Sequence, residues 1–259
     1  MGVAGAPYKA QGIVLRKTKL GESDLIVTVL AHDGSEIRAI AHGARKPRSA
    51  FSSRLELCAH VELLCARGRS LDIIQEARLV AGNERLRASI ERAAAANLVA
   101  EVVARTIHGG LAAPRLFDMT AQALSRIDAA EVSCVLPIAV ACGWKTVSLA
   151  GLRPSLERCV ACGTSVNLAH MMGGHVSFSY ADGGVVCAKC AQALPAEQVG
   201  AAVLALTSFF ITSTFARIEA APLDSEDALA QVRFLERWSH VHLSASLKSV
   251  GFLLSCGLF

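Results

Sequence analysis

Two Cys-x-x-Cys pairs in the second half of the chain constrain its fold more than any other feature of the sequence. The first pair is Cys159 and Cys162, and the second is Cys187 and Cys190. Each pair brings two sulfur atoms to one tight turn, and two such turns can surround one Zn²⁺ with Zn–S bonds of about 2.3 Å. A shell of four thiolates has no open position for a substrate. The spacing therefore predicts one structural zinc ion.

Three other interpretations of these cysteines stay open: disulfide bonds, a redox-active pair and thiols without a ligand. Disulfide bonds would need an oxidising compartment, and we recognise no secretory signal in the first residues. A redox-active pair would account for one Cys-x-x-Cys motif but not for two. His170 and His175 lie between the pairs and could replace a cysteine ligand, although we expect both at the surface.

The other five cysteines stand singly among apolar residues, which is typical of small core residues in a reducing cytoplasm. They are Cys58, Cys65, Cys134, Cys142 and Cys256.

The N-terminal third has the pattern of short strands. Apolar, β-branched runs are separated by turn signals such as Asp33-Gly34 and Arg67-Gly68-Arg69. The runs cover residues 9–17, 25–30, 36–42, 55–65 and 71–77. Five short strands without a long helix predict a small closed barrel of the OB type.

The apolar pattern changes to a helical spacing after residue 83. We expect helices over residues 83–105, 116–127, 132–142, 224–242 and 246–256, and one more that begins at Pro195. Gly143 should end the third of these helices. The predicted class is therefore α+β. An OB barrel covers residues 1–80, and a helical domain covers 81–259 with the zinc module inserted at about 155–195.

Residues 199–216 carry no charge and approach the length of a membrane span. They include several serines and threonines and lack flanking Trp or Tyr residues, so we expect a buried helix and no membrane attachment.

The net charge of +4 is concentrated at the N-terminal end. Residues 1–80 contain 12 Lys and Arg against 8 Asp and Glu, whereas the remainder is balanced. Basic side chains neutralise backbone phosphates and give binding that depends on salt. The loop over residues 43–54 and a second basic turn supply the predicted DNA-binding residues, with a solvated loop that has no partner as the alternative. They are Arg16, Lys17, Lys19, Arg38, Arg45, Lys46, Arg48 and Arg54.

Aromatic residues are scarce in this third of the chain, where Tyr8 and Phe51 are the candidates for stacking on bases. Binding should therefore depend on phosphates and show little sequence preference. We find no Gly-rich phosphate loop, HExxH or GxSxG motif, so nothing in the sequence predicts an enzyme.

The order of these parts resembles the RecO family of bacterial recombination mediators. The resemblance extends over almost the whole chain, and the Gly-Ala-Arg-Lys loop with the cysteine spacing is its most specific part. The stretches that carry it are residues 12–15, 21–24, 41–49, 156–163, 183–190 and 247–249.

The resemblance implies a cytoplasmic, nucleoid-associated protein of DNA repair and homologous recombination without enzymatic activity. Such a protein binds single- and double-stranded DNA and anneals complementary strands. It also engages the C-terminal tail of the single-strand-binding protein, joins RecR and helps to load RecA. The competing class is a zinc-ribbon adaptor or RNA-binding assembly factor without a role in repair.

Overall fold

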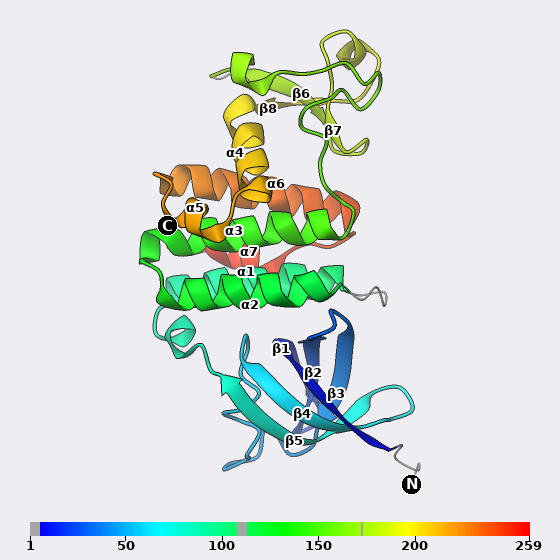
Figure 1. Cartoon of the computed structure of the whole chain (residues 1–259), viewed down its shortest axis with the longest axis vertical. Coiled ribbons are helices and arrows are strands. Elements are labelled where there is room, and N and C mark those ends of the chain that lie inside the picture. Colours follow the sequence, from blue (N-terminus) through cyan, green and yellow to red (C-terminus); the bar gives the residue numbers. More distant parts are fainter. Residues whose placement is uncertain (1–5, 108–112, 172) are drawn as a thin grey trace. The chain divides into compact units, whose positions relative to one another are not determined.

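The computed structural model describes residues 6–107, 113–171 and 173–259. Internal contacts divide the chain into two units, Met1–Ala130 and Glu131–Phe259, and each is described by itself. Figure 1 labels their helices and strands. The barrel and the two helices that follow it belong to the first unit, so the division of the chain into domains at residue 80 stays a prediction.

Five strands open the first unit: β1 (Pro7–Leu20), β2 (Asp24–Ala31), β3 (Glu36–Ala41), β4 (His60–Ala66) and β5 (Asp72–Ala81). They form a closed barrel in the order β1-β2-β3-β5-β4. The neighbours pair antiparallel except β3 and β5, whose parallel pairing closes the barrel. The predicted OB-type barrel is confirmed.

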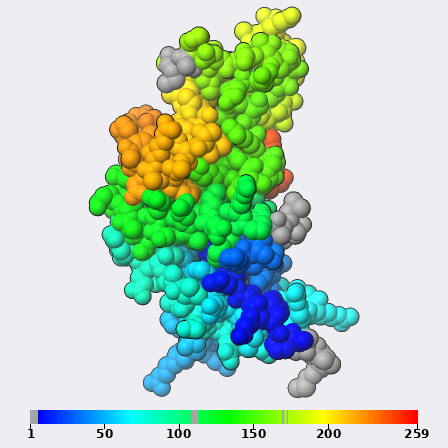
Figure 2. Space-filling view, viewed as in Figure 1, coloured from blue at the N-terminus to red at the C-terminus, as the bar shows by residue number. Residues whose placement is uncertain are grey.

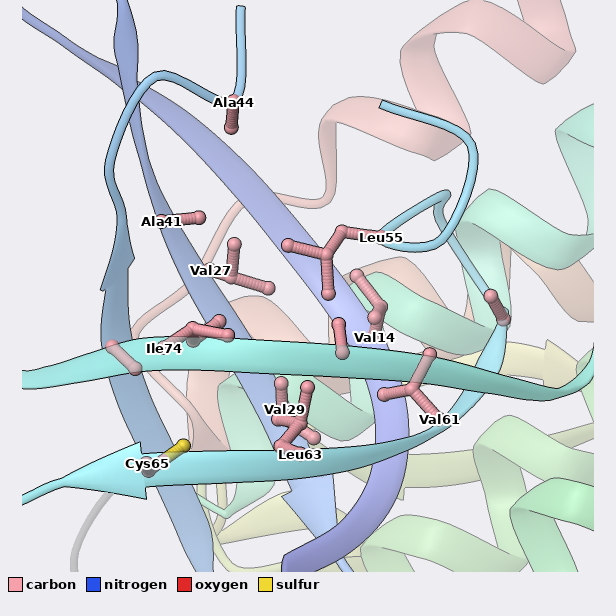
Figure 3. Close-up of a cluster of buried hydrophobic side chains, with 13 residues drawn as sticks. Val14, Val27, Val29, Ala41, Ala44, Leu55, Val61, Leu63, Cys65 and Ile74 are labelled. Atoms are coloured by element: carbon pink, nitrogen blue, oxygen red, sulfur yellow. The ribbon is translucent and has the colours of Figure 1, made fainter. Parts of the chain in front are cut away.

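Small and branched apolar side chains fill the barrel (Figure 3). Val14 from β1, Val27 and Val29 from β2 and Leu63 from β4 are among its buried residues. Val27 and Val29 point the same way because alternate residues of a strand share a face. Cys65 also lies in this core, as predicted for a small buried residue.

The fourth strand begins later than the apolar run from residue 55 predicts. Leu55 contributes to the barrel core from a turn, and β4 begins only at His60. Cys58 between them has a left-handed backbone with a φ of 63°. Its N–H donates to the carbonyl of Val14 at 2.8 Å, so this segment is tied to β1 before regular pairing starts.

Two helices complete the first unit after a short 3-10 turn, η1 (Glu84–Arg87). They are α1 (Ile90–Thr106) and α2 (Pro114–Ala129), and α1 packs against both β1 and α2. The hydroxyl of Ser89 accepts the N–H of Arg92 and caps the start of α1.

A buried arginine joins these two helices. Arg92 is only 6% exposed, and its guanidinium donates to the carbonyls of Ile127, Asp128 and Ala130 at the end of α2. Carbonyls at the end of a helix lack partners within the helix, so a positive donor is well placed there.

The second unit is helical with an inserted module. The helices are α3 (Val132–Leu149), α4 (Ala201–Thr212), α5 (Phe215–Glu219), α6 (Ser225–His242) and α7 (Lys248–Ser255), and α3 contacts α4, α5 and α6. The module contains η2 (Leu168–Met171), β6 (His175–Ser179), β7 (Gly184–Val185), η3 (Cys190–Gln192) and β8 (Glu197–Gly200). Its strands form an antiparallel sheet in the order β7-β6-β8.

Two tryptophans and a glutamine organise the core of this unit. The indole N–H of Trp144 donates to the side-chain oxygen of Gln231 at 2.9 Å, and the Gln231 amide donates to the carbonyl of Val203. These bonds connect α3, α6 and α4. Trp238 lies 6.2 Å from Trp144 between ring centroids, and both indoles are buried.

The prediction that Gly143 ends the third helix is wrong, because α3 continues to Leu149. A Cβ atom at Gly143 would lie 2.5 Å from Cδ2 of Leu235, which is on α6. The glycine therefore permits a close approach of two helices. A stop signal and a packing glycine look the same in a sequence.

The uncharged run over residues 199–216 is divided between the end of β8, α4 and α5, and Pro195 precedes β8 instead of opening the helix. With 12 residues, α4 is shorter than the roughly 20 residues that a membrane span needs. Among the described residues, α3 is long and apolar enough to cross a membrane, but 67% of that helix is buried inside the structure. It has the character of a core helix.

The five cysteines outside the two Cys-x-x-Cys pairs differ in burial. Cys58, Cys65 and Cys142 are buried as predicted, and Cys134 is half-buried. Cys256 is exposed, so its prediction as a core residue is wrong. It directly follows the last residue of α7, where the helix no longer packs it.

Candidate nucleic-acid interface and metal centre

The four paired cysteines come together in the second unit. The Sγ atoms of Cys159, Cys162, Cys187 and Cys190 all lie within 4.8 Å of one another. Those of Cys162 and Cys187 are 3.7 Å apart. Zinc–sulfur bonds of about 2.3 Å place the corners of a tetrahedron about 3.8 Å apart. The sulfur positions therefore fit one tetrahedral metal ion.

The two histidines that could have replaced a cysteine ligand do not join this group. His170 and His175 are both exposed. Across the part of the chain that the structure describes, the cluster consists of the four cysteines alone. A closed four-thiolate shell fits a structural role better than a catalytic one.

Backbone hydrogen bonds shape both cysteine turns. In the first, the N–H of Gly163 donates to the carbonyl of Cys159 at 2.9 Å, and the N–H of Cys159 donates to the carbonyl of Thr164 at 2.9 Å. Gly163 has a φ of 74°, a left-handed conformation that glycine adopts without a steric penalty. In the second turn, the N–H of Ala191 donates to the carbonyl of Cys187 at 3.0 Å.

The electrostatics of the cluster favour a cation. Hydrogen bonding from the backbone N–H of Cys187 lowers the pKa of the Cys159 thiol to about 6. The Thr164 hydroxyl, 3.2 Å from Sγ of Cys162, lowers the pKa of that thiol. The pKa of Cys190 is raised to about 12 by the neighbouring thiols of Cys162 and Cys187. Four neighbouring thiolates repel one another, and a divalent metal ion at this position would relieve that repulsion.

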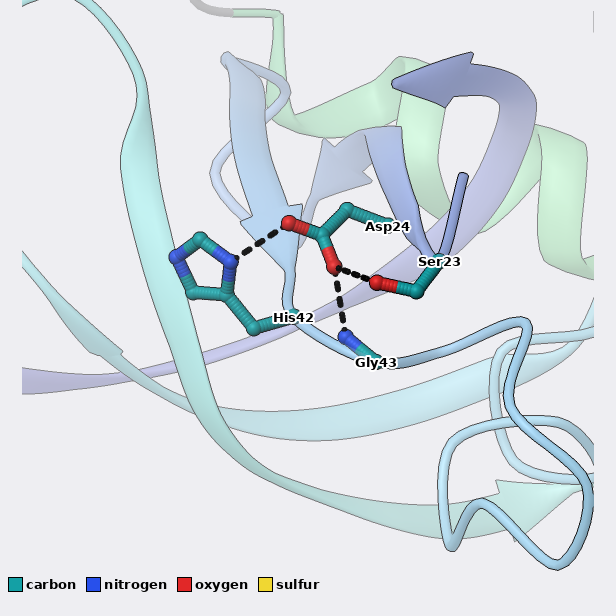
Figure 4. A network of polar contacts seen from close by, with 4 residues as sticks. All are labelled: Ser23, Asp24, His42 and Gly43. Atoms are coloured by element: carbon teal, nitrogen blue, oxygen red, sulfur yellow. Dashed lines mark hydrogen bonds and ion pairs between the residues drawn. The ribbon is translucent and has the colours of Figure 1, made fainter. Parts of the chain in front are cut away.

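In the first unit, the predicted basic loop is fastened by Asp24 at the start of β2 (Figure 4). The carboxylate accepts the N–H of Gly43 at 2.8 Å, the hydroxyl of Ser23 at 2.9 Å and Nδ1 of His42 at 2.8 Å. These bonds, that of Gly43 foremost, lower the pKa of Asp24 to about 2. The ionised carboxylate thus fixes the place where the loop leaves β3.

Arg45 makes a second attachment of this loop. Its Nη1 donates to the carbonyls of Gly21 and Glu22 at 3.1 and 2.8 Å, and its backbone N–H donates to the carbonyl of Ser23 at 2.8 Å. Although the side chain is exposed, these bonds direct its guanidinium to the β1–β2 turn. The geometry gives Arg45 a positioning role for the loop.

Two further predicted DNA-binding residues also have partners in the barrel. Nζ of Lys17 lies 2.8 Å from a carboxylate oxygen of Glu56. Nη1 of Arg54 donates to the carbonyl of Ala77 at 3.2 Å. Each contact uses part of the hydrogen-bonding capacity that a phosphate would need.

The other five predicted residues are exposed, and none of their side chains makes a hydrogen bond or ion pair with another described residue. They are Arg16, Lys19, Arg38, Lys46 and Arg48. Figure 2 shows the loop over 43–54 (light blue) and the β4–β5 turn (cyan) projecting from the barrel. The structure therefore separates the predicted set into anchored and available cations.

The structure also brings together basic residues that the sequence prediction did not include. Lys9, Arg67 and Arg69 line a groove of about 690 Å³ with Arg38, and Cζ of Arg67 lies 4.5 Å from the centre of the Tyr8 ring. Three acids line the same groove: Asp33, Glu36 and Asp72. Arg67-Gly68-Arg69 is recognisable as a turn, but only the barrel places it beside Arg38.

The fold and these sites define a class of protein that has a basic OB-type barrel and a helical unit with a cluster of four cysteines. The family model described as "Recombination protein O N terminal" matches residues 6–83, and "Recombination protein O C terminal" matches 87–250. The chain belongs to the RecO family of DNA repair proteins.

Individual RecO proteins are similar to this chain over nearly its full length. The DNA repair protein RecO of Synechococcus sp. (strain JA-3-3Ab) is 31% identical over 98% of this chain and 87% of its own. The RecO protein of Bifidobacterium longum subsp. infantis is 29% identical over 94% of this chain and 97% of its own. The RecO protein of a Nocardioides strain is 31% identical over 95% and 98%.

Proposed function

We propose that this protein is a non-enzymatic mediator of homologous recombination in DNA repair. It binds single- and double-stranded DNA, anneals complementary strands and, with RecR, helps to load RecA onto DNA coated by the single-strand-binding protein. The observation that carries the proposal is the group of exposed cations on an OB-type barrel in a RecO family member. Arg16, Lys19, Arg38, Lys46 and Arg48 are available to phosphates.

The proposed mechanism is charge neutralisation. Two strands repel each other through their phosphates, and cations that hold both strands reduce this repulsion and release counterions. Because the contacts go to phosphates, we expect weak sequence preference and a steep loss of affinity with salt. The protein acts on nucleoid DNA in the cytoplasm.

We further propose that the four cysteines hold one structural Zn²⁺. Four thiolates at tetrahedral spacing are a donor set typical of zinc. The metal would join the two cysteine turns, and the chain's own residues would carry out DNA binding elsewhere. The C-terminal tail of the single-strand-binding protein is assigned to the helical unit.

The test is annealing of two labelled complementary oligonucleotides over a salt series, without nucleotide. The wild type should accelerate annealing at low salt and lose this effect as salt rises. The double variant Lys46→Ala with Arg48→Ala should anneal more slowly and bind single strands with a salt slope lower by about 0.7 for each lost contact. Glu226→Ala with Arg233→Ala, on an exposed part of α6, is the control and should behave as the wild type.

A second arm uses strands coated with the matching single-strand-binding protein, with or without its C-terminal tail. Removal of the tail should slow annealing on coated strands only. Failure of the folded, metal-loaded wild type to anneal bare strands would contradict the proposal. A preference for structured RNA would instead support the zinc-ribbon adaptor.

A further inference from the structure

Three arginines from separate elements of the first unit surround one small pocket. Arg16 comes from β1, Arg38 from β3 and Arg105 from the last turn of α1. The pocket has a volume of about 280 Å³. Arg105 lies outside the predicted DNA-binding set, because it is far from the basic loop in the sequence and belongs to a helix.

The strand register explains why two of these arginines face each other. Arg16 pairs with Thr28 on β2, and Thr28 pairs with Arg38 on β3. Residues directly opposite each other in antiparallel strands point to the same face, so the three side chains form one row across the barrel. A register shift between Val14 and Arg16 sets this face. With strands about 4.8 Å apart, the two arginines arise about 10 Å from each other.

The chemistry of the lining suits an oxyanion. The guanidinium groups of Arg16, Arg38 and Arg105 make no hydrogen bond or ion pair with other residues in the described part of the chain. Thr18 and Thr28 add hydroxyl donors, and one acid, Glu36, is present. Guanidinium groups with hydroxyls are the usual ligands of phosphate. Among the described residues, the apolar part of the lining is Ile26 and Ala104, which is too little apolar surface for an acidic peptide with hydrophobic side chains.

We propose that Arg16, Arg38 and Arg105 together bind one backbone phosphate of a nucleic-acid strand. The inference rests on the proposed function and extends it, because it carries the strand from the barrel onto α1. Arg38 also lines the groove that contains Lys9, Arg67 and three acids, so the pocket and the groove share this arginine. Arg105 is then a DNA-contacting residue supplied by a helix.

The experiment compares Arg105→Gln with Arg233→Gln, an exposed arginine of α6 that removes the same charge from the second unit. Binding of a labelled single-stranded oligonucleotide is measured by anisotropy over a salt series. Arg105→Gln should weaken binding roughly threefold to tenfold at low salt and lower the salt slope by about 0.7. Arg233→Gln should leave the slope unchanged. Circular dichroism should show that both variants keep the native helix content.

A second measurement locates the contact. Oligonucleotides that carry a single neutral methylphosphonate at successive positions are bound to each variant. At one position of the oligonucleotide, the methylphosphonate should weaken binding to the wild type but not to Arg105→Gln. The reason is that Arg105→Gln already lacks the guanidinium that contacts this phosphate in the wild type.

If the wild type binds and Arg105→Gln keeps its slope and its full methylphosphonate profile, the inference is wrong while the proposed function stands. If the wild type itself does not bind, both fail. Loss of binding to an acidic peptide in Arg105→Gln, with DNA binding intact, would also overturn the inference and assign the pocket to a protein partner.

Discussion

Single residues in the basic region of the barrel divide into those that hold its shape and those that face solvent. Asp24 and Arg45 fasten the loop over 43–54 to the start of β2 and the β1–β2 turn. Lys46 and Arg48 are exposed on the same loop. Substituting Arg45, Lys46 and Arg48 as equivalent cations would mix two effects, a moved loop and the loss of a proposed phosphate contact.

Asp24 makes a prediction that depends on pH. Its pKa in the folded protein is about 2, below the usual 3.8, so the ionised carboxylate stabilises the fold above about pH 4. This contribution is lost as the pH falls from about 4 through 2. The wild type should therefore be more stable than Asp24→Asn at pH 5, and the difference should narrow at lower pH.

The measurement is urea unfolding of both proteins at several pH values. Asp118→Asn, which alters an exposed carboxylate on α2, serves as the control and should differ little from the wild type throughout. A stability difference that stays constant from pH 5 to 3 would show that the charge of Asp24 is not what holds the loop.

The sequence shows which residues of the barrel are basic, but it does not show which of them bond to the backbone and which stay exposed. Local spacing reveals that Arg45 and Arg48 lie in one basic loop. It does not reveal that Arg45 meets the carbonyl of Glu22, because that bond forms only when β1, β2 and β3 pair. Arg105 is the opposite case. Its place beside Arg16 follows from the packing of α1 on β1 and has no signal within its own helix.

At the scale of elements, α1 and α2 depend on Arg92. Arg92→Met keeps most of the apolar stem but leaves the carbonyls of Ile127, Asp128 and Ala130 without their charged donor. Burying acceptors without partners should cost about 2–4 kcal/mol of unfolding free energy. Arg115→Met, on an exposed part of α2, should change it by less than about 0.5 kcal/mol.

Urea denaturation of the full chain, followed by circular dichroism, measures this difference. If Arg92→Met proved as stable as Arg115→Met, water molecules would be donating hydrogen bonds to the carbonyls at the end of α2 in place of the guanidinium. The comparison would then remove Arg92 from the interactions that fix the helix pair.

Helices and strands could be predicted where a local pattern of apolar residues defines them. The helices α2 and α6 follow their apolar periodicity, and β2 follows its β-branched run. The predictions that were wrong concern residues whose role depends on tertiary contacts. Gly143 looks like a stop signal but makes room for Leu235, and Leu55 enters the barrel core from a turn instead of from a strand. In both cases the deciding contact lies elsewhere in the chain.

At the scale of the whole molecule, the excess positive charge and the four-cysteine cluster belong to different units. The excess of Lys and Arg lies within residues 1–80, whereas the four cysteines all lie in Glu131–Phe259. Losing the metal should therefore affect the second unit most directly and leave the barrel folded.

Metal removal tests this separation. The purified protein should release one equivalent of Zn²⁺ to a chromogenic chelator. Calorimetry should then show the transition of the second unit lowered by roughly 5 °C or more, because metal binding contributes to folding. Cys162→Ser should reproduce the shift, and Cys256→Ser, an exposed cysteine outside the site, should not.

An unshifted transition after complete metal loss would contradict a structural role for the ion. A single shifted transition for the whole chain would instead show that the two units unfold together.

The positions of the two tryptophans have a practical consequence. Trp144 and Trp238 are the only tryptophans in the chain, and both are buried in the second unit. Tryptophan fluorescence therefore reports on the second unit alone, because the barrel contains no tryptophan. DNA that saturates the barrel would leave that emission unchanged unless the second unit also responds. A change in intrinsic fluorescence on adding DNA would therefore show that the second unit responds to DNA, through its own contact with the strand or through the barrel.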